Sequence, residues 1–195
     1  DIIKPEATLN TNETSVATGI IKMDKKLIII LDFEKIVTDI SPETGLKVSD
    51  ITLLGERERC DEPILMAEDS PLLSQLISDS LKKAGYTNLI RTANGDEAWK
   101  QLEKFKKEGN PTEKVSCIIT DIEMPVMDGH RLTKLVKSDE ELKSIPLVIF
   151  SSLVNDEMRA KGHALGADYQ LSKPEIGSLV QVIDKLLGKG KEENE

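Results

Sequence analysis

From Pro63 onward the chain alternates between short apolar runs and segments with the spacing of amphipathic helices. The apolar runs have the length of strands that are buried on both faces of a sheet. The segments between them carry apolar residues three and four positions apart, as a helix packed on a sheet does. This alternation predicts an α/β domain with a five-stranded parallel sheet covered by helices on both faces. The expected strands are Ile64–Ala67, Leu89–Ala93, Val115–Thr120, Leu147–Phe150 and Tyr169–Ser172, and the expected helices span 72–84, 96–107, 130–137, 156–165 and 176–187.

The first 45 residues follow a different pattern. The stretch TSVATGIIKMDKKLIIILDFEKI predicts two strands joined by a tight turn at 24–26, then a short helix near 33–38. Because two strands do not make a stable domain alone, residues 1–45 are interpreted as part of a larger β domain or as an arm packed on something else. Residues 46–61 predict a charged, solvated linker, 62–189 the α/β domain and 190–195 a frayed tail.

Composition excludes several classes of function. The formal net charge of −9 disfavours binding to a phosphate backbone, and only 3% aromatic residues disfavour stacking on nucleic-acid bases. No apolar run approaches 18 residues, so no membrane insertion is expected. Cys60 and Cys117 lie far apart, which indicates free thiols in a reducing cytoplasm. Cys117 is expected in the core, and Cys60 is expected to be exposed in the linker.

Polar side chains follow four of the expected strands at the point where each strand ends. Glu68 and Asp69 follow the first, Asp121 the third, Ser151 the fourth and Lys173 the fifth. The carboxyl ends of parallel strands meet at one edge of a sheet, where ligands bind in such folds. We therefore expect these five side chains to converge on one cleft.

The chemistry of this set points to a phosphoryl group. Three carboxylates this close repel one another unless a divalent cation lies among them, and hard oxygen ligands suit Mg²⁺ or Mn²⁺. A carboxylate can accept phosphorus as an acyl phosphate, with the cation, the Lys173 ammonium and the Ser151 hydroxyl contacting the phosphoryl oxygens. Asp121 is the expected nucleophile because its loop, built around Pro125 and Gly129, supplies further backbone groups to the metal.

Each residue also has a structural interpretation. Glu68 and Asp69 precede Ser-Pro and could cap a helix, and Asp121 could be a turn residue. Ser151 could be an ordinary hydroxyl at a strand end, and Lys173 a surface lysine. Four such coincidences at four strand ends are improbable together, so the site interpretation is favoured. The histidines, His130 and His163, are expected to be solvated on helix surfaces.

A second aliphatic run, IIILDFEKI, also ends in Asp-x-Glu, at Asp32 and Glu34. No other polar residues of the set accompany it. We interpret these two acids as the start of the short helix near 33–38, with side chains that cap or are solvated.

With these residues in place, the sequence resembles a two-component receiver domain. The matching motifs are ILMAEDS, IITDIEMPVMDG, PLVIFSS and LSKP, in the order of that family, over roughly residues 62–188. The resemblance implies a flavodoxin-like fold with strand order 2-1-3-4-5. It also implies that a histidine kinase phosphorylates Asp121, with Asp69 and the Glu123 backbone carbonyl binding Mg²⁺ and Glu68 acting through water. Ser151 would move toward the phosphoryl group and Lys173 would pair with it.

One position departs from the family pattern. Receivers often carry an aromatic residue three positions before the lysine, and its rotamer reports phosphorylation. Gln170 holds that position here, next to Tyr169, so a different switch is expected.

The stretch TGIIKMDKKLIIILDFEKI resembles the C-terminal part of a CheW-like coupling domain, which has an SH3-like barrel fold. A CheW-like domain followed by a receiver is the arrangement of CheV-type chemotaxis proteins. The resemblance implies a phosphorylation-regulated adaptor, not an enzyme, whose partners are chemoreceptors and a CheA-type histidine kinase. The incomplete β domain suggests a truncated piece, so residues 14–32 are expected to pair across a dimer or lie against the receiver.

Two other functions remain open. A phosphate sink would draw phosphoryl groups from the kinase without passing the signal on. A haloacid-dehalogenase-type phosphatase also uses an Asp nucleophile, a hydroxyl, a lysine and an acidic pair. In that family the acidic pair comes last and an Asp follows two residues after the nucleophile, whereas here the pair comes first and Glu123 holds that position.

Overall fold

The computed structural model describes residues 2–3, 17–23, 26–31, 57–152, 155–173 and 175–189 of the 195-residue chain. The chain divides into two compact units, residues 1–45 and 46–195. Within the described part of unit 1, β1 (Ile2–Ile3), β2 (Ala17–Met23) and β3 (Lys26–Leu31) form an antiparallel sheet in the order β1-β2-β3. The sequence pattern predicts β2 and β3 but not the two-residue β1. The helix expected near 33–38, together with Asp32 and Glu34, lies outside the described residues.

Unit 2 is an α/β sandwich with one parallel sheet, as predicted. The sheet order β5-β4-β6-β7-β8 corresponds to 2-1-3-4-5 when the strands of this unit are numbered from its own start. The strands are β4 (Ile64–Ala67), β5 (Leu89–Thr92), β6 (Cys117–Thr120), β7 (Leu147–Ser151) and β8 (Tyr169–Ser172). The helices are α3 (Pro71–Lys83), α4 (Gly95–Glu108), α5 (Pro111–Lys114), α6 (Gly129–Ser138), α7 (Asp156–Ala164) and α8 (Ile176–Leu186).

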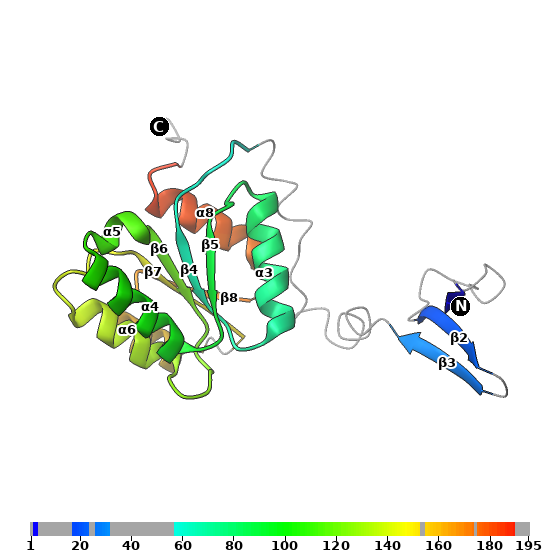
Figure 1. Ribbon diagram of the computed structural model, residues 1–195. Coiled ribbons are helices and arrows are strands. Elements are labelled where there is room, and N and C mark those ends of the chain that lie inside the picture. The colour runs from blue at the N-terminus through cyan, green and yellow to red at the C-terminus, as the bar shows by residue number, and fades with distance from the viewer. Residues whose placement is uncertain are drawn as a thin grey trace, which may run out of the picture. The chain divides into compact units, whose positions relative to one another are not determined.

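Two apolar cores lie on opposite faces of this sheet. In Figure 1, α3 and α8 lie on one side, whereas α4 and α6 lie on the other. Neighbouring residues of a strand point to opposite faces, so Met66 packs in the α3–α8 core and Leu65 in the α4–α6 core. Both side chains are almost completely buried. Burial on both faces explains why the strands appear in the sequence as continuous apolar runs.

Two features of this unit differ from expectation. The short helix α5 is absent from the sequence prediction, because its four residues carry no apolar periodicity; Pro111 at its first turn is the only signal. The segment 57–61, expected to be solvated, is bound to the α/β unit. Cys60 is 5% exposed, not free in solvent as predicted, because its backbone bridges to Tyr86 at the α3–β5 turn. Cys117 is buried in the core, as expected.

None of the helices in the described part of the chain is long and apolar enough to cross a membrane.

Candidate functional site

The carboxyl ends of β4 and β6 bring three acidic side chains together. These strands are parallel neighbours, with Ala67 opposite Thr120, so the residues that follow each strand are adjacent. Glu68 and Asp121 are almost completely buried, at 3% and 7% exposed, whereas Asp69 is exposed. One carboxylate oxygen of each of these three acids lies within 4.8 Å of the others. The convergence expected from the strand ends is therefore present.

Lys173 reaches the same cluster from the end of β8. Its Nζ lies 2.6 Å from Asp121 Oδ2 and 2.8 Å from Glu68 Oε2, and the residue is 4% exposed. Burial lowers the pKa of the Lys173 ammonium, but hydrogen bonds to both carboxylates outweigh it and leave the pKa above its usual value. Burial raises the pKa of Glu68, and Lys173 offsets this only in part. Lys173 is thus a buried, charged partner of the acids and not a surface lysine.

Ser151 ends β7, between the strands that deliver Asp121 and Lys173. It is 2% exposed, and its backbone carbonyl accepts a hydrogen bond of 3.2 Å from the Lys173 amide. This bond fixes the spacing between the hydroxyl-bearing residue and the lysine at the same edge of the sheet.

The α3 helix does not use the acidic pair as its cap. Ser70 is the N-cap, and its Oγ accepts a hydrogen bond of 3.3 Å from the Leu73 amide. Glu68 accepts a 3.2 Å bond from the Ser70 amide through Oε1, while Oε2 faces Lys173. The capping role is therefore filled by Ser70, and Asp69 remains exposed beside Asp121.

The loop between β6 and α6 folds back tightly on Asp121. The Ile122 amide donates to Asp121 Oδ1 at 2.6 Å, and the Gly129 amide donates to the Ile122 carbonyl at 2.9 Å. A Cβ at Gly129 would lie 1.8 Å from the Asp121 carbonyl oxygen, so only glycine permits this approach. Val126, at the tip, has φ of 68° and is 78% exposed, an unusual conformation for a β-branched residue. The Ile122 amide thus orients the Asp121 carboxylate, and Gly129 permits the close return of the loop to the Asp121 backbone.

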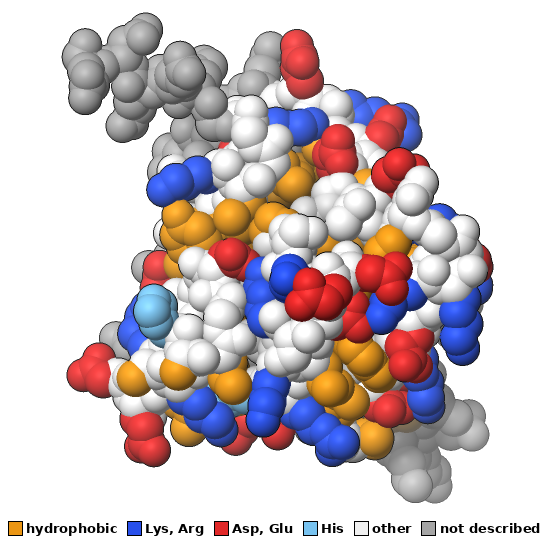
Figure 2. Space-filling view, turned by 90° about the vertical axis from the view of Figure 1, so that its left-hand side faces the viewer, with side chains coloured by type: hydrophobic (Ala, Val, Ile, Leu, Met, Phe, Trp, Pro, Cys, Tyr) orange, Lys and Arg blue, Asp and Glu red, His pale blue; other side chains and the backbone are white. Residues whose placement is uncertain are grey.

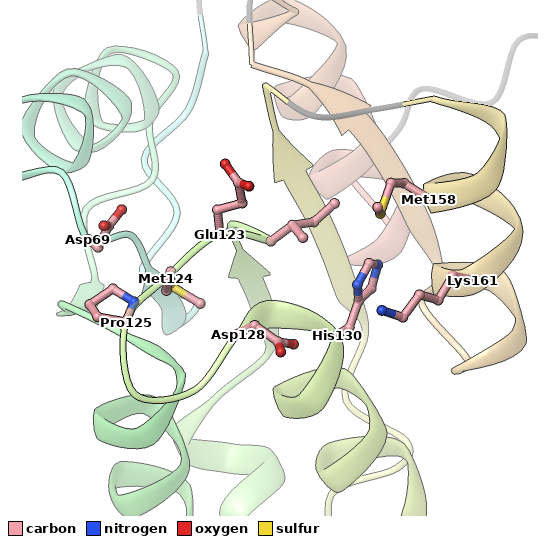
Figure 3. A pocket seen from close by; sticks show the side chains of 9 residues that line it. Asp69, Glu123, Met124, Pro125, Asp128, His130, Met158 and Lys161 are labelled. Atoms are coloured by element: carbon pink, nitrogen blue, oxygen red, sulfur yellow. The ribbon is translucent and has the colours of Figure 1, made fainter.

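A pocket of about 500 Å³ opens beside the acidic cluster. Figure 3 shows Asp69, Met124 and Pro125 on one side of it and His130, Met158 and Lys161 on the other. Glu123, whose carbonyl was expected to bind metal, is exposed and also lines this pocket.

His130 is buried, at 4% exposed, and the prediction of a solvated surface histidine is wrong for it. The residue occupies the first turn of α6 and faces α7, a packing that the sequence pattern of α6 alone does not reveal. His130 Nε2 is buried without a hydrogen-bond partner among the described residues. His163 is exposed, as predicted.

The donor set of the cluster fits a hard divalent cation. Its ligand atoms are all carboxylate oxygens, which Mg²⁺ and Mn²⁺ prefer, and the exposed Asp69 leaves one side open to water and to a substrate. Glu68 and Asp121 are both paired with Lys173, so two buried negative charges face one positive charge. Asp69 adds a third negative charge beside them. A cation among the three acids reduces this excess negative charge.

Comparisons with known proteins agree with this geometry. The family model of the response regulator receiver domain matches residues 64–184. The Helicobacter pylori chemotaxis proteins CheV3 and CheV2 are 29% and 32% identical to the chain over 179 and 182 residues. These matches cover 91% and 90% of this chain but 56% and 55% of the relatives, so the chain spans about half the length of the curated relatives it matches.

Solved structures show the same fold. The Vibrio cholerae chemotaxis protein CheY4 superposes with a TM-score of 0.55 at 29% identity, covering 66% of this chain and 100% of that one. The α/β unit thus has the flavodoxin-like receiver fold, with the strand order expected from the sequence. From its α/β architecture, the acids at the strand ends and the match over residues 64–184, the chain belongs to the response regulator receiver domain family.

Proposed function

We propose that Asp121 is the phosphoacceptor of a Mg²⁺-dependent receiver. The observation that carries this proposal is the buried contact of Lys173 with Asp121 and Glu68, within a cluster of three carboxylates. Asp69, Asp121, the Glu123 carbonyl and, through water, Glu68 hold Mg²⁺, which neutralises charge on the transferring phosphoryl oxygens. The protein is in this role a phosphoacceptor and not an enzyme acting on a separate substrate.

Each residue of the site has a separate role in the proposed phosphoryl transfer. An Asp121 carboxylate oxygen forms the new O–P bond as the N–P bond of a phosphohistidine donor breaks, and the donor imidazole takes up a proton. Lys173 transfers its contact from the Asp121 carboxylate to a phosphoryl oxygen. Ser151 donates a hydrogen bond to another phosphoryl oxygen. Ile122, whose amide already binds Asp121 Oδ1, keeps the carboxylate oriented for attack.

The experiment is phosphorylation with acetyl phosphate in the presence of Mg²⁺, followed by intact-mass measurement. Wild type gains one phosphoryl group, and Asp121→Asn gains none. Asp79→Asn is the matched control, because Asp79 is an exposed acid on α3 that lies outside the cluster. Equal labelling of wild type and Asp121→Asn refutes the proposed site.

We further propose that the receiver regulates a chemotaxis adaptor in the cytoplasm. The matches to the CheV proteins extend over about 180 residues, well beyond the receiver at 64–184, and so reach into the segment proposed to be CheW-like. The proposed partners are a CheA-type histidine kinase and chemoreceptors. Both cysteines are free and buried, which suits a reducing compartment.

Nucleic acid is not among the proposed partners. On the face in Figure 2, lysine and arginine side chains are interspersed with acidic ones instead of gathering into a basic surface. The net charge of −9 also disfavours binding to the negatively charged phosphate backbone of a nucleic acid.

A dimer through the N-terminal strands is also proposed. Among the described residues β3 pairs only with β2, and the proposed second chain would pair along the other edge of β3. Analytical ultracentrifugation that finds only monomer at high concentration contradicts this dimer.

An experiment with receptor, kinase and the complete coupling domain separates the adaptor from a phosphate sink. An adaptor is retained by the receptor–kinase complex in a pulldown, and phosphorylation changes the amount retained. A sink lowers the phosphorylated fraction of the kinase without being retained.

A further inference from the structure

The segment that leads into the receiver is bound to the C-terminal helix by a partly buried ion pair. Arg57 donates through Nη2 to Asp184 of α8 and through Nε, at 2.8 Å, to the Ala84 carbonyl at the end of α3. Asp184 is 9% exposed and accepts a second hydrogen bond, of 2.5 Å, from the Tyr86 hydroxyl. One arginine thus joins the incoming segment to two helices.

Tyr86 is suited to remain a donor in this network. Burial and the adjacent Asp184 carboxylate both raise the pKa of the Tyr86 phenol above its usual value. The Asp184 carboxylate is therefore held by one charged and one neutral donor, and loss of Arg57 leaves the Tyr86 phenol as its remaining side-chain hydrogen-bond donor among the described residues.

Backbone contacts continue the attachment through Cys60. The Cys60 amide donates to the Gly85 carbonyl at 2.8 Å, and the Cys60 carbonyl accepts from the Thr87 amide at 3.1 Å. The Lys189 ammonium, just beyond α8, lies 2.7 Å from Cys60 Sγ. Gly85 has φ of 95°, and a Cβ there would lie 2.4 Å from the Glu58 carbonyl oxygen, so the turn is shaped to receive the segment.

The other end of α8 lies next to the phosphorylation site. Lys173 precedes the helix start at Ile176 by three residues and is held by Asp121 and Glu68. A phosphoryl group on Asp121 places the negative oxygens farther out from the sheet edge than the carboxylate itself. If the Lys173 backbone shifts to follow them, the start of α8 three residues later is displaced as well, because a helix moves as a rigid element.

We propose that the Arg57–Asp184 pair is the joint through which phosphorylation of Asp121 is passed to the segment preceding the receiver. Displacement of α8 weakens the attachment of residues 57–60, and this segment is the covalent connection to everything before it in the chain. The inference rests on the proposed function, since it takes Asp121 as the phosphoacceptor. It assigns to Arg57 and Asp184 a positioning role in output, with no contact to the phosphoryl group.

Thermodynamic linkage gives a sharp test, because coupling between two sites is reciprocal. If phosphorylation weakens the attachment, then removal of the attachment must tighten binding of a phosphoryl mimic by the same factor. Calorimetric titration of Mg²⁺ and beryllofluoride into the full chain is expected to show about fivefold tighter binding in Arg57→Ala than in wild type. Arg59→Ala is the matched control, because Arg59 lies two residues away in an exposed pair with Asp61. It should leave the affinity unchanged.

The rate at which the Cys60 thiol is labelled measures the same coupling in the other direction, from the phosphoryl mimic to the attached segment. Cys117 is fully buried, and burial raises its thiol pKa to about 12, so a thiol reagent reports on Cys60. Mg²⁺ with beryllofluoride should speed the labelling of Cys60 about fivefold in wild type. In Arg57→Ala labelling should already be fast and should no longer respond. Arg57→Lys keeps the charge but loses the hydrogen bond to the Ala84 carbonyl, so it should give intermediate values in both assays. It replaces Arg57→Ala as the test variant if Arg57→Ala is too unstable to measure.

The outcomes separate the two proposals. Failure of wild type to bind beryllofluoride overturns the proposed function together with this inference. Normal binding by wild type, with Arg57→Ala and Arg57→Lys unchanged within twofold or weakened, overturns the inference alone.

Discussion

Lys173 and Asp121 form a direct ion pair in which both side chains are almost completely buried and Nζ lies 2.6 Å from Oδ2. The same ammonium lies 2.8 Å from Glu68. One cation therefore holds two acids that otherwise repel each other, and the site is arranged around the charge of this lysine. The contacts of Lys173 and of the residues around the site determine the free energy of unfolding and the binding of a phosphoryl mimic, both of which can be measured.

Replacement of Lys173 by methionine should destabilise the protein because Glu68 and Asp121 are left buried without their counter-charge. We expect the free energy of unfolding in urea to fall by about 3 kcal/mol at neutral pH, and added Mg²⁺ to recover more stability than it gives to wild type. The control is Lys100→Met, which removes an exposed lysine paired with Asp96. A change no larger than that of the control contradicts the buried ion pair.

Gly129→Ala should disrupt the loop that carries Asp121. The new Cβ would lie 1.8 Å from the Asp121 carbonyl oxygen, so the backbone after β6 must move. We expect loss of beryllofluoride binding together with a fall in melting temperature. Gly109→Ala is the comparison, because Gly109 has φ of 83° and a Cβ there would have nothing within 4 Å. It should cost only about 1 kcal/mol of backbone strain and keep binding intact.

Gln170 and Gly162 should behave as a coupled pair. The Gln170 amide donates to the Arg159 carbonyl of α7 at 2.6 Å, and Arg159 donates back to the Gln170 carbonyl at 3.2 Å. A Cβ at Gly162 would lie 2.5 Å from Gln170 Oε1, so an alanine there would displace the Gln170 amide from its present position.

A double-mutant cycle measured by urea unfolding tests this coupling. Gly162→Ala should destabilise wild type but cost at least about 1 kcal/mol less in the Gln170→Ala background, where the obstructing amide is absent. Additive effects of the two substitutions show that they do not interact. A coupled result identifies a β8–α7 tether at the position where receivers often carry an aromatic residue.

His130 should make stability depend on pH. Burial, followed by the charge of Lys161, lowers the pKa of His130 below its usual 6.5, and Asp128 opposes this. Between the folded-state pKa and 6.5 the unfolded chain binds more protons than the folded one, so stability rises with pH through this window and falls on acidification.

His130→Leu should flatten this dependence. We expect its melting temperature relative to wild type to rise by about 2–4 °C as the pH is lowered from 7.5 to 5.5, a shift that corresponds to about 1 kcal/mol in a domain of this size. His163→Leu, at an exposed position, is the control and should follow wild type. Parallel curves for all three proteins contradict a buried, neutral His130.

Sequence patterns predict the sheet because its strands are buried on both faces. Ile64–Ala67 and Tyr169–Ser172 begin and end where the apolar runs do, and the strand order is the one that the receiver motifs imply. The site residues are also predictable, since parallel strands must deliver their next residues to one edge. Local composition and chain direction are sufficient for the strands and for the residues at their ends, whereas the strand order is expected from the resemblance to receivers.

The rest depends on contacts between distant segments, which no local pattern encodes. The sequence predicts exposed side chains for His130 and Cys60, which stand among charged residues. In the structure both are buried: His130 faces α7 across a pocket, and Cys60 is held by the α3–β5 turn. The pairing of Arg57 with Asp184 spans 127 residues. By itself the sequence determined the strands, the helices between them and the polar residues at the strand ends, because hydrophobic burial and strand direction act locally. Only the tertiary structure decided which charges became buried partners, because the energy of a charge depends on what folds against it.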